Sequence, residues 1–452
     1  MIFAKRALLA DGWAADVRLE VADGRITGVL SGQRAADGDV QVDTLLPALS
    51  NLHSHSFQRA MAGMTEYRAA GRESFWTWRE LMYRFLEHLT PETVEAIAAQ
   101  VFMEMQEAGY AAVGEFHYVH HQPGGAHYGS ISELSERVFA AAATTGIGLT
   151  HLPVLYTYGG AGTKPLAGGQ KRFGNTVEDF ARLLEAARAR ASALPGDTVV
   201  GIAPHSLRAT CPEDLARALP LAAGAPVHIH IAEQPQEVAD ITAWLGARPV
   251  EWLLANAPVG PDWCAIHATH MTEAECAGLA RSGTVAGLCP VTEANLGDGP
   301  FMGPGWLAAG GAFGVGSDSN VRISLVEELR TLEYSQRLRD VARNVMVPDA
   351  GSVGDFLYRG AAAGGAQALG REAGVIGEGK LADLVAIDSG HTALCALTET
   401  QLLDGLAFAA PDGVVTDLWS AGRHQVRGGR HVARDRIVPA YRRAITTLVA
   451  AL

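Results

Sequence analysis

The sequence has few cysteines and no long apolar run, and each shortage excludes a class of protein. Its five cysteines are scattered, odd in number and form no Cys-x-x-Cys pair. A disulfide framework and a cysteine-based zinc site are therefore not expected. No apolar stretch is long enough to span a bilayer, and the apolar run near the N-terminus is too short for a signal peptide. We therefore expect a cytoplasmic protein that does not enter a membrane.

Positive charge is also scarce. The 36 lysines and arginines are outnumbered by 49 aspartates and glutamates, which gives a net charge of −13. Such a charge argues against binding to nucleic acid or to an anionic membrane surface, although a pocket can still be locally positive. The hydrophobic share of 48% and the charged share of 19% suit a globular enzyme with a sizeable core.

Short apolar runs alternate with helical patterns through the middle of the chain. The runs that predict strands span residues 44–52, 112–117, 148–155, 199–204, 226–232, 263–267, 284–288 and 314–318. Helical patterns lie between several of them, at residues 90–108, 131–145 and 177–192. Eight strands that alternate with helices predict an α/β fold of the (β/α)8 TIM-barrel type, with a doubly wound open sheet as the alternative.

Both ends of the chain contain short strand patterns that are too small to fold alone. Residues 1–46 alternate apolar and polar positions around a turn at 22–25. After residue 374 come a strand pattern, a hairpin at 417–432 and a closing helix at 435–452. We expect residues 1–46 and 374–452 to form one small β-sandwich beside a barrel of residues 47–373.

Two long connections interrupt the middle region. Residues 57–83 are rich in Arg, Trp and Gly, and residues 156–175 are rich in Gly. Loops of this length inside a compact domain are usually functional or mobile, so we expect both to cover a site. A disordered surface excursion is the alternative for the second.

Histidines and one aspartate stand at the ends of the predicted strands. His53 and His55 are two positions apart, so in a strand they point to the same face. His230 and Asp318 stand near the ends of two later strands. The carboxyl ends of barrel strands meet at one face, where barrel active sites lie. Although each histidine alone could be a packed residue, the four together predict a metal site of the nitrogen and oxygen ligands that Zn²⁺ favours.

Two further residues suggest how such a metal would be used. Glu233 lies just past a strand end and could move a proton from a metal-activated water, whose pKa falls to roughly 7, to a leaving nitrogen. His267 could stabilise the attacking oxygen, and Asp318 could be ligand and proton acceptor at once. Glu233, His267 and Asp318 are therefore the predicted catalytic residues of a hydrolase.

These motifs resemble the amidohydrolase superfamily, and above all its deaminase branch. The matching stretches are residues 47–55, 230–233, 267, 317–319 and 379–385, so the resemblance extends over nearly the whole chain. It implies a (β/α)8 barrel with a metal at the strand ends, and a homodimer, which is common in this branch.

The number of metal ions follows from a lysine that is missing. Two-metal members of the superfamily carry a carboxylated lysine at the fourth strand. The lysines of this chain are Lys5, Lys164, Lys171 and Lys380, and the end of the fourth predicted strand carries His205 instead. One metal per chain is therefore implied, most simply Zn²⁺, although iron and manganese also accept these ligands.

Local motifs within the branch are similar to the formimidoylglutamate deiminase family of histidine degradation. They lie at residues 53–61, 75–80, 114–120, 203–208 and 230–234. That family hydrolyses N-formimidoyl-L-glutamate to N-formyl-L-glutamate and ammonia. At the matching positions the resemblance implies that the substrate is bound by Gln58, Arg79, Tyr118, His205 and Arg208.

Two arginines separate this function from its alternatives. Arginine forms bidentate pairs with carboxylates, so Arg79 and Arg208 favour a dicarboxylate substrate, unless they are ordinary surface charges. A deaminase of guanine or a related heterocycle would instead need aromatic and amide contacts to a flat ring. A non-catalytic scaffold relative is the other alternative, but such relatives typically lose metal ligands, and this chain keeps all four.

Overall fold

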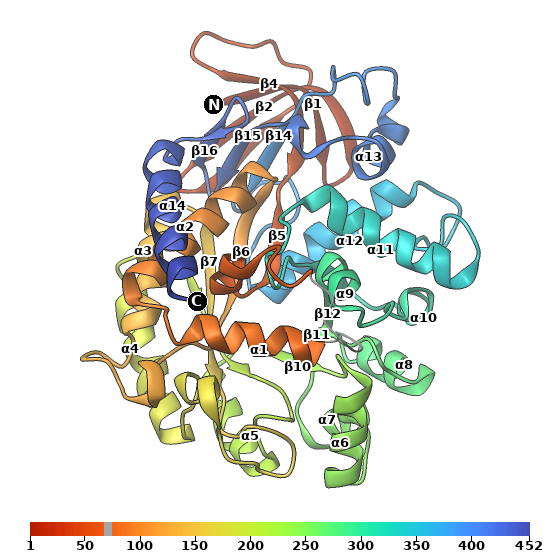
Figure 1. Ribbon diagram of the computed structural model, residues 1–452. Coiled ribbons are helices and arrows are strands. Elements are labelled where there is room, and N and C mark those ends of the chain that lie inside the picture. The colour runs from red at the N-terminus through yellow and green to blue at the C-terminus, as the bar shows by residue number, and fades with distance from the viewer. Residues whose placement is uncertain (67–74) are drawn as a thin grey trace.

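Strands from both ends of the chain form one mixed sheet. The computed structural model describes residues 1–66 and 75–452, and the sheet lies at one end of the molecule, at the top of Figure 1. Its strand order is β17-β16-β15-β14-β4-β1-β2-β3. The members are β1 (Ile2–Leu9), β2 (Gly12–Ala22), β3 (Arg25–Leu30), β4 (Val40–Pro47), β14 (Leu384–Ile387), β15 (Val415–Ser420), β16 (Arg423–Arg427) and β17 (Arg430–His431).

The middle of the chain contributes parallel strands that alternate with helices. They form two sheets, β5-β6-β7-β8 with β9 beside β7, and β10-β11-β12-β13. Single parallel bridges join the two sheets, from Ser54 to Asp318 and from Ile202 to Val227. The strands are β5 (Leu49–Ser54), β6 (Tyr110–His117), β7 (Gly148–Leu155), β8 (Val199–Val200), β9 (Ala203–Pro204), β10 (Val227–Ile231), β11 (Trp263–His267), β12 (Val285–Leu288) and β13 (Phe313–Val315).

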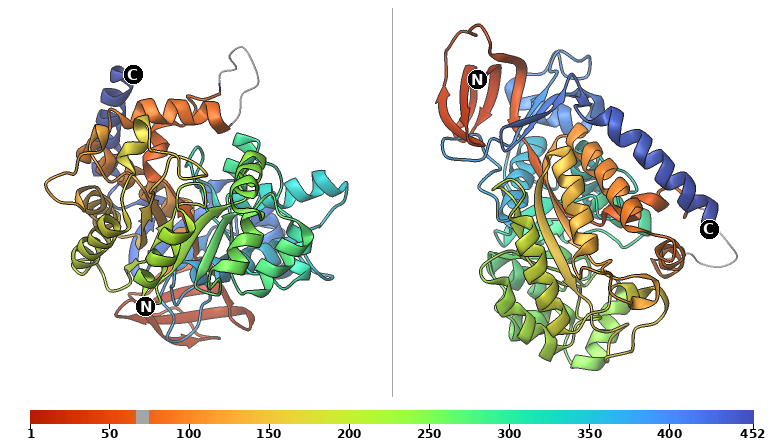
Figure 2. Two further views of the ribbon diagram at one scale, coloured as in Figure 1. Left: turned by 90° about the horizontal axis from the view of Figure 1, so that it is seen from below. Right: turned by 90° about the vertical axis from the view of Figure 1, so that its left-hand side faces the viewer.

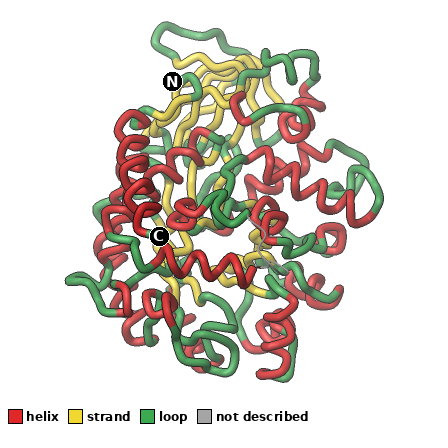
Figure 3. Tube along the Cα trace, viewed as in Figure 1, coloured by secondary structure: helices red, strands yellow, loops and turns green. Residues whose placement is uncertain are grey.

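Helices surround these parallel strands, as the red and yellow segments of Figure 3 show. Several begin at a side-chain cap: the Thr90 side chain accepts a hydrogen bond from the Thr93 backbone N–H at the start of α2, and the Thr272 side chain accepts one from the Glu275 backbone N–H at the start of α8. The helices are α1 (Phe75–Leu86), α2 (Pro91–Glu107), α3 (Glu133–Thr145), α4 (Val177–Ala191), α5 (Pro212–Ala218), α6 (Pro235–Leu245), α7 (Pro249–Asn256), α8 (Glu273–Arg281), α9 (Pro290–Leu296), α10 (Gly303–Ala308), α11 (Leu325–Asp340), α12 (Val353–Ala368), α13 (Glu399–Phe408) and α14 (Arg434–Ala451).

The C-terminal helix α14 lies along α2 on the outside of the molecule (Figures 1 and 2). No helix within residues 1–66 and 75–452 is long and apolar enough to cross a membrane.

Most predicted strands are present, but two predicted runs are divided. Residues 44–52 hold the end of β4 and most of β5, which belong to different sheets, and the Ala48 backbone between them donates to the Asp383 carbonyl. Pro47 has no N–H and cannot continue the ladder of β4. Residues 199–204 hold two short strands, β8 and β9, separated by residues 201–202.

The first long connection is largely not a loop. A 3-10 helix (Ser56–Met61) follows β5, and α1 occupies the end of the predicted loop. Residues 67–74 of that prediction lie outside the described residues. The second connection is irregular apart from a short 3-10 helix (Gly168–Arg172), as expected.

Candidate active site

The four predicted metal ligands lie together at the carboxyl ends of the parallel strands. His53 lies at the end of β5 and His55 directly follows that strand, His230 belongs to β10, and Asp318 follows β13. Their ligand atoms all lie within 4.8 Å of one another, and all four side chains are buried. Strands that are far apart in sequence therefore bring three imidazoles and one carboxylate to a single point.

Backbone hydrogen bonds between the end of β5 and the segment after β13 fix part of this cluster. The Asp318 N–H donates to the His53 carbonyl at 3.0 Å, and the His55 N–H donates to the Asp318 carbonyl at 2.9 Å. Gly316 allows the close approach, because a Cβ at this position would lie only 2.7 Å from backbone atoms of His53. Because residue 316 has no side chain, the chain after β13 can approach β5, and the Asp318 carboxylate lies beside both histidines.

Hydrogen bonds on the far side of two rings decide which nitrogen faces the cluster. Nδ1 of His55 donates to the Phe116 carbonyl at 2.9 Å, and Nδ1 of His230 donates to the His205 carbonyl at 3.1 Å. With the proton on Nδ1, Nε2 of each ring keeps a free lone pair, as in metal sites where backbone carbonyls orient the ligands.

The distances at the centre fit a divalent cation. Nε2 of His230 lies 3.1 Å from Nε2 of His53, and Asp318 Oδ1 lies 3.4 and 3.3 Å from Nε2 of His53 and His55. Burial lowers the pKa of His53 to about 3 and also lowers the pKa values of His55 and His230, so the rings are neutral. Neutral imidazoles and a carboxylate that point at one another are a donor set for a borderline metal such as Zn²⁺.

His267 and Glu233 lie beside this donor set. His267 Nε2 is 4.0 Å from Glu233 Oε1 and 4.0 Å from Asp318 Oδ2. Its other nitrogen, Nδ1, lies 3.2 Å from Oε1 of the buried Glu293. Burial acts to lower the pKa of His267, but the hydrogen bond to Glu293 and the nearby carboxylates outweigh it and raise that pKa to about 10.

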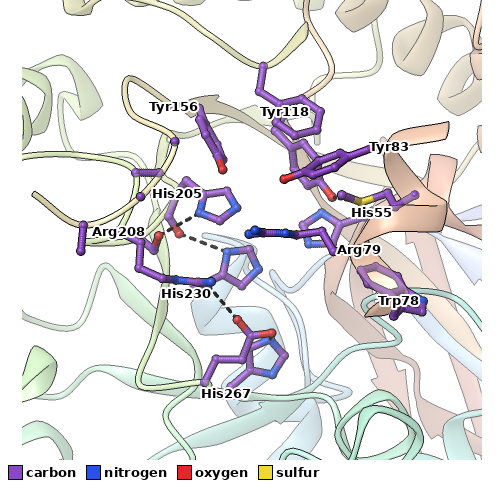
Figure 4. A pocket seen from close by; sticks show the side chains of 18 of the residues that line it. His55, Trp78, Arg79, Tyr83, Tyr118, Tyr156, His205, Arg208, His230 and His267 are labelled. Atoms are coloured by element: carbon purple, nitrogen blue, oxygen red, sulfur yellow. Dashed lines mark hydrogen bonds and ion pairs between the residues drawn. The ribbon is translucent and has the colours of Figure 1, made fainter. Parts of the chain in front are cut away.

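A cavity of about 200 Å³ opens above these groups. All five residues that were predicted to bind substrate line it, although they come from four different segments of the chain. Figure 4 shows Arg79, Arg208 and Tyr156 turned towards the same space as His230. Two arginines thus face one cavity in a protein of net charge −13.

Two of the lining residues are hydrogen-bonded to each other. Gln58 Nε2 donates to the Tyr118 hydroxyl at 2.6 Å, whereas Oε1 of Gln58 is buried and has no hydrogen-bond partner among the described residues. His205 Nδ1 lies 3.0 Å from the Ser206 hydroxyl, and burial lowers the pKa of His205 well below its ordinary value. The Arg79 guanidinium lies 5.6 Å from the centre of the Tyr83 ring.

Sequence reasoning missed several residues of this site. Trp78 and Tyr83 of α1 and Tyr156 of the second connection line the cavity, and Glu293 contacts His267. Glu293 lies in α9, five residues past the end of the predicted strand at 284–288, so its position relative to that strand gave no signal.

Family comparison agrees with this geometry. Residues 44–424 match the model described as "Amidohydrolase family", and residues 1–42 match "Formimidoylglutamate deiminase HutF, N-terminal domain". A formimidoylglutamate deiminase of Pseudomonas aeruginosa is 49% identical over 445 residues, which are 97% of each chain. A 5-methylthioadenosine/S-adenosylhomocysteine deaminase of Natronomonas pharaonis is 29% identical, with 94% of this chain and 89% of that protein covered.

Solved structures give the same result. An amidohydrolase from Brucella melitensis superposes with a TM-score of 0.95 at 47% identity, with 99% of both chains covered. An adenosine deaminase from Xanthomonas campestris with bound zinc, 22% identical, has a TM-score of 0.83 over 99% of this chain and 98% of its own, and so shares the fold. With a family model matched over most of its length and a relative matched from end to end, the chain belongs to the amidohydrolase family, on the branch of the formimidoylglutamate deiminases.

Proposed function

We propose that this protein hydrolyses N-formimidoyl-L-glutamate to N-formyl-L-glutamate and ammonia, a step of histidine degradation. The observation that carries the proposal is that Arg79 and Arg208, which are far apart in sequence, line one cavity with His230 and Glu233. Two guanidinium groups beside a set of metal-ligating side chains match a substrate with two carboxylates and a hydrolysable C–N bond. The full-length relative named for this activity supports the same reaction.

His53, His55, His230 and Asp318 would hold one divalent cation, most simply Zn²⁺, with iron or manganese as other occupants. Such a cation acts as a Lewis acid and makes a water molecule a stronger nucleophile at neutral pH. One ion per chain is proposed because the four donors form a single cluster and because His205, not a lysine, follows β9.

Glu233 would move the proton. The water oxygen bonds to the formimidoyl carbon while Glu233 takes one proton from the water and delivers it to the leaving nitrogen. As the C–N bond to that nitrogen breaks and the formyl C=O forms, the oxygen gives up its second proton through Asp318 and Glu233 to the same nitrogen, which departs as ammonia. His267 Nε2 lies 4.0 Å from both Glu233 Oε1 and Asp318 Oδ2, so an oxygen atom between them can contact all three groups. His267 would hold that oxygen by donating from Nε2, while Asp318 accepts.

The substrate carboxylates would be bound at the outer wall of the cavity. Arg79 and Arg208 present guanidinium groups, which pair with carboxylates in a fixed plane. Gln58, Tyr118 and His205 would bind the remaining polar atoms, and the buried Oε1 of Gln58, which no described residue satisfies, is suited to accept an N–H of the substrate.

The proposal includes the architecture around the site. Residues 47–373 would form a closed (β/α)8 barrel, in which the bridges from Ser54 to Asp318 and from Ile202 to Val227 join the sheets. Residues 1–46 and 374–452 would form a β-sandwich, supported by the Gly379 N–H that donates to the Ile26 carbonyl at 2.8 Å. A homodimer in the cytoplasm is the proposed working form.

An ammonia-release screen tests the function. Formimidoylglutamate, guanine and adenosine are supplied to the purified, zinc-loaded protein. We expect ammonia from formimidoylglutamate alone. Release from a purine instead would favour a heterocycle deaminase, and no release from any substrate after zinc loading would favour the scaffold alternative.

A further inference from the structure

A buried glutamate outside the predicted catalytic set lies behind Glu233. Glu237 belongs to the first turn of α6, and its side chain is fully buried. Its Oε1 accepts a hydrogen bond from the Ala232 N–H at 3.2 Å, and its Oε2 accepts one from the Glu233 N–H at 3.1 Å. Ala232 has a φ of +51°, a left-handed conformation that a non-glycine residue adopts only when its surroundings hold it there. The Glu237 carboxylate therefore fixes the turn from which the Glu233 side chain extends.

The same carboxylate also faces an arginine of the cavity wall. Oε2 of Glu237 lies 3.7 Å from Nε of Arg208, and Nη2 of Arg208 donates to Oε2 of Glu233 at 2.9 Å. The Arg208 side chain is 11% exposed and that of Glu233 7%, so these charges interact with little screening by water. The Arg208 guanidinium thus lies between two carboxylates. Of these two carboxylates, only that of Glu233 was predicted to be catalytic.

We propose that Glu237 is a positioning residue that sets Glu233 and Arg208 together. It holds the backbone of the proton carrier by two hydrogen bonds and holds the guanidinium of the substrate-binding arginine by its charge. Binding of a substrate carboxylate and proton transfer then depend on one buried side chain that touches neither the substrate nor the reacting atoms. This inference rests on the proposed function of Glu233 and Arg208.

Glu237→Gln tests the inference because glutamine keeps the size and removes the charge. The substitution should lower kcat and raise KM for formimidoylglutamate, each by about 10-fold or more, since hydrogen bonds to charged groups contribute to both. The metal content should stay at the wild-type value. Glu237→Asp, which keeps the charge, should retain more activity than Glu237→Gln.

Glu275→Gln is the matched control. Glu275 is also a buried glutamate in the first turn of a helix, where it accepts from Arg248 Nε at 2.8 Å and from the Thr272 N–H at 2.7 Å. It does not line the cavity. Its substitution should change stability but leave both kcat and KM near their wild-type values.

The double variant Arg208→Ala/Glu237→Gln separates the two effects of Glu237. If Glu237 acts on substrate binding through Arg208, adding Glu237→Gln to Arg208→Ala should raise KM by less than about 3-fold, while kcat still falls. Independent, multiplying effects on KM would contradict the inference, as would equal kinetic losses in the Glu237→Gln and Glu275→Gln variants.

Crystal structures of the wild type and of Glu237→Gln keep the test independent of the substrate assignment. We expect the Arg208 guanidinium and the Glu233 carboxylate to move apart in the variant. If both stay in place, the inference is wrong, whichever substrate the enzyme uses. If they move but the wild type releases no ammonia from formimidoylglutamate, the proposed function is wrong and the positioning by Glu237 stands. If the Glu237→Gln protein does not fold, Glu237→Met, which also removes the charge, takes its place in the same comparison.

Discussion

Two buried polar clusters of this molecule differ in how their charges are satisfied. At the carboxyl ends of the strands, Nε2 atoms of His53 and His230 lie 3.1 Å apart, and Nδ1 of His53 has no partner among the described residues. Near the opposite ends of the strands, Arg371 pairs with Asp383 at 2.9 Å and with Asp197 at 3.1 Å, and Arg423 pairs with Asp197 at 2.8 Å. We call these the donor cluster (His53, His55, His230, Asp318) and the arginine cluster (Asp197, Arg371, Asp383, Arg423).

The two clusters differ in whether their own side chains balance one another. In the arginine cluster every cation faces a carboxylate, so the group is complete without a further ion, and it joins the C-terminal strands β14 and β16 to the segment before β8. In the donor cluster, lone pairs of several side chains converge and need a cation between them. Barrel folds separate these roles in the same way, with chemistry at the carboxyl face and stability at the amino face.

Metal removal should have the largest effect on activity. Chelation should abolish ammonia release, and returning Zn²⁺ should restore it, because the donor cluster lacks its cation. His55→Asn should bind less than about one tenth of the wild-type metal, since it removes one of four ligands. His228→Asn is the control: His228 is buried in the same region, but its Nε2 bonds to the Ala368 carbonyl at 2.7 Å. Metal analysis that finds the two variants equally depleted would remove His55 from the ligand set.

Glu233→Gln should leave the metal in place and stop the proton transfer. We expect kcat for formimidoylglutamate to fall by about 10²- to 10⁴-fold, the range typical for loss of a general acid–base group. Steady-state ammonia assays on variant protein with a measured metal content provide the test. A kcat within 10-fold of the wild type would mean that another group carries the proton.

Arg208→Ala should act on the substrate more than on the metal. Loss of a charged hydrogen-bond donor to a carboxylate predicts a rise in KM of about 10- to 100-fold, with normal metal content. Arg248→Ala is the control, because Arg248 also pairs with a buried glutamate but lies outside the cavity. Unchanged turnover of formimidoylglutamate at low concentration would overturn the dicarboxylate assignment.

Much of the site could be anticipated from the sequence, because histidines and carboxylates directly after apolar runs are visible without coordinates. His53, His55, His230 and Asp318 were found in this way, and the structure brings them together. Glu237 and Glu293 were not found, since their partners, Arg208 and His267, are 29 and 26 residues away and meet them only after folding. Glu237 lies in α6 and Glu293 in α9, and contacts that such helix residues make with distant segments leave no periodic pattern in a single sequence.

The bounds of the helices and strands could also be predicted only in part from the sequence. Strands β7 and β11 have the predicted bounds. Residues 44–52 are buried along most of their length in both sheets, so the apolar pattern did not reveal that β4 ends before β5 begins. The helix α1 was missed because residues 57–83 were interpreted as one loop from their overall composition, although residues 75–86 contain neither Gly nor Pro.

Arg371→Met should lower stability without changing metal content or turnover, whereas substitutions in the donor cluster should lower metal content or turnover. It leaves the buried Asp383 without its closest cation, which should cost about 3–5 kcal/mol in the free energy of unfolding. The kcat and metal content of the folded protein should not change. Arg25→Met, which breaks an exposed pair with Glu372, should cost less than about 1 kcal/mol. Denaturant unfolding followed by fluorescence measures both, and a loss of metal in Arg371→Met would show that the two clusters are coupled.

The smallest expected effect is a pH dependence of stability at Asp197. Burial acts to raise the pKa of Asp197, but the hydrogen bond from Arg423 and the charges of Arg371 and Arg423 outweigh it and lower that pKa below its ordinary value. A carboxyl with a lowered pKa in the folded state stabilises the fold above its unfolded pKa of about 4, and this contribution is lost as the pH falls through the folded value. The difference in unfolding free energy between the wild type and Asp197→Asn should therefore shrink from about pH 5 downwards. Asp11→Asn, at an exposed position, serves as the control. A difference that stays constant to about pH 3 would show that Asp197 acts through packing and not through its charge.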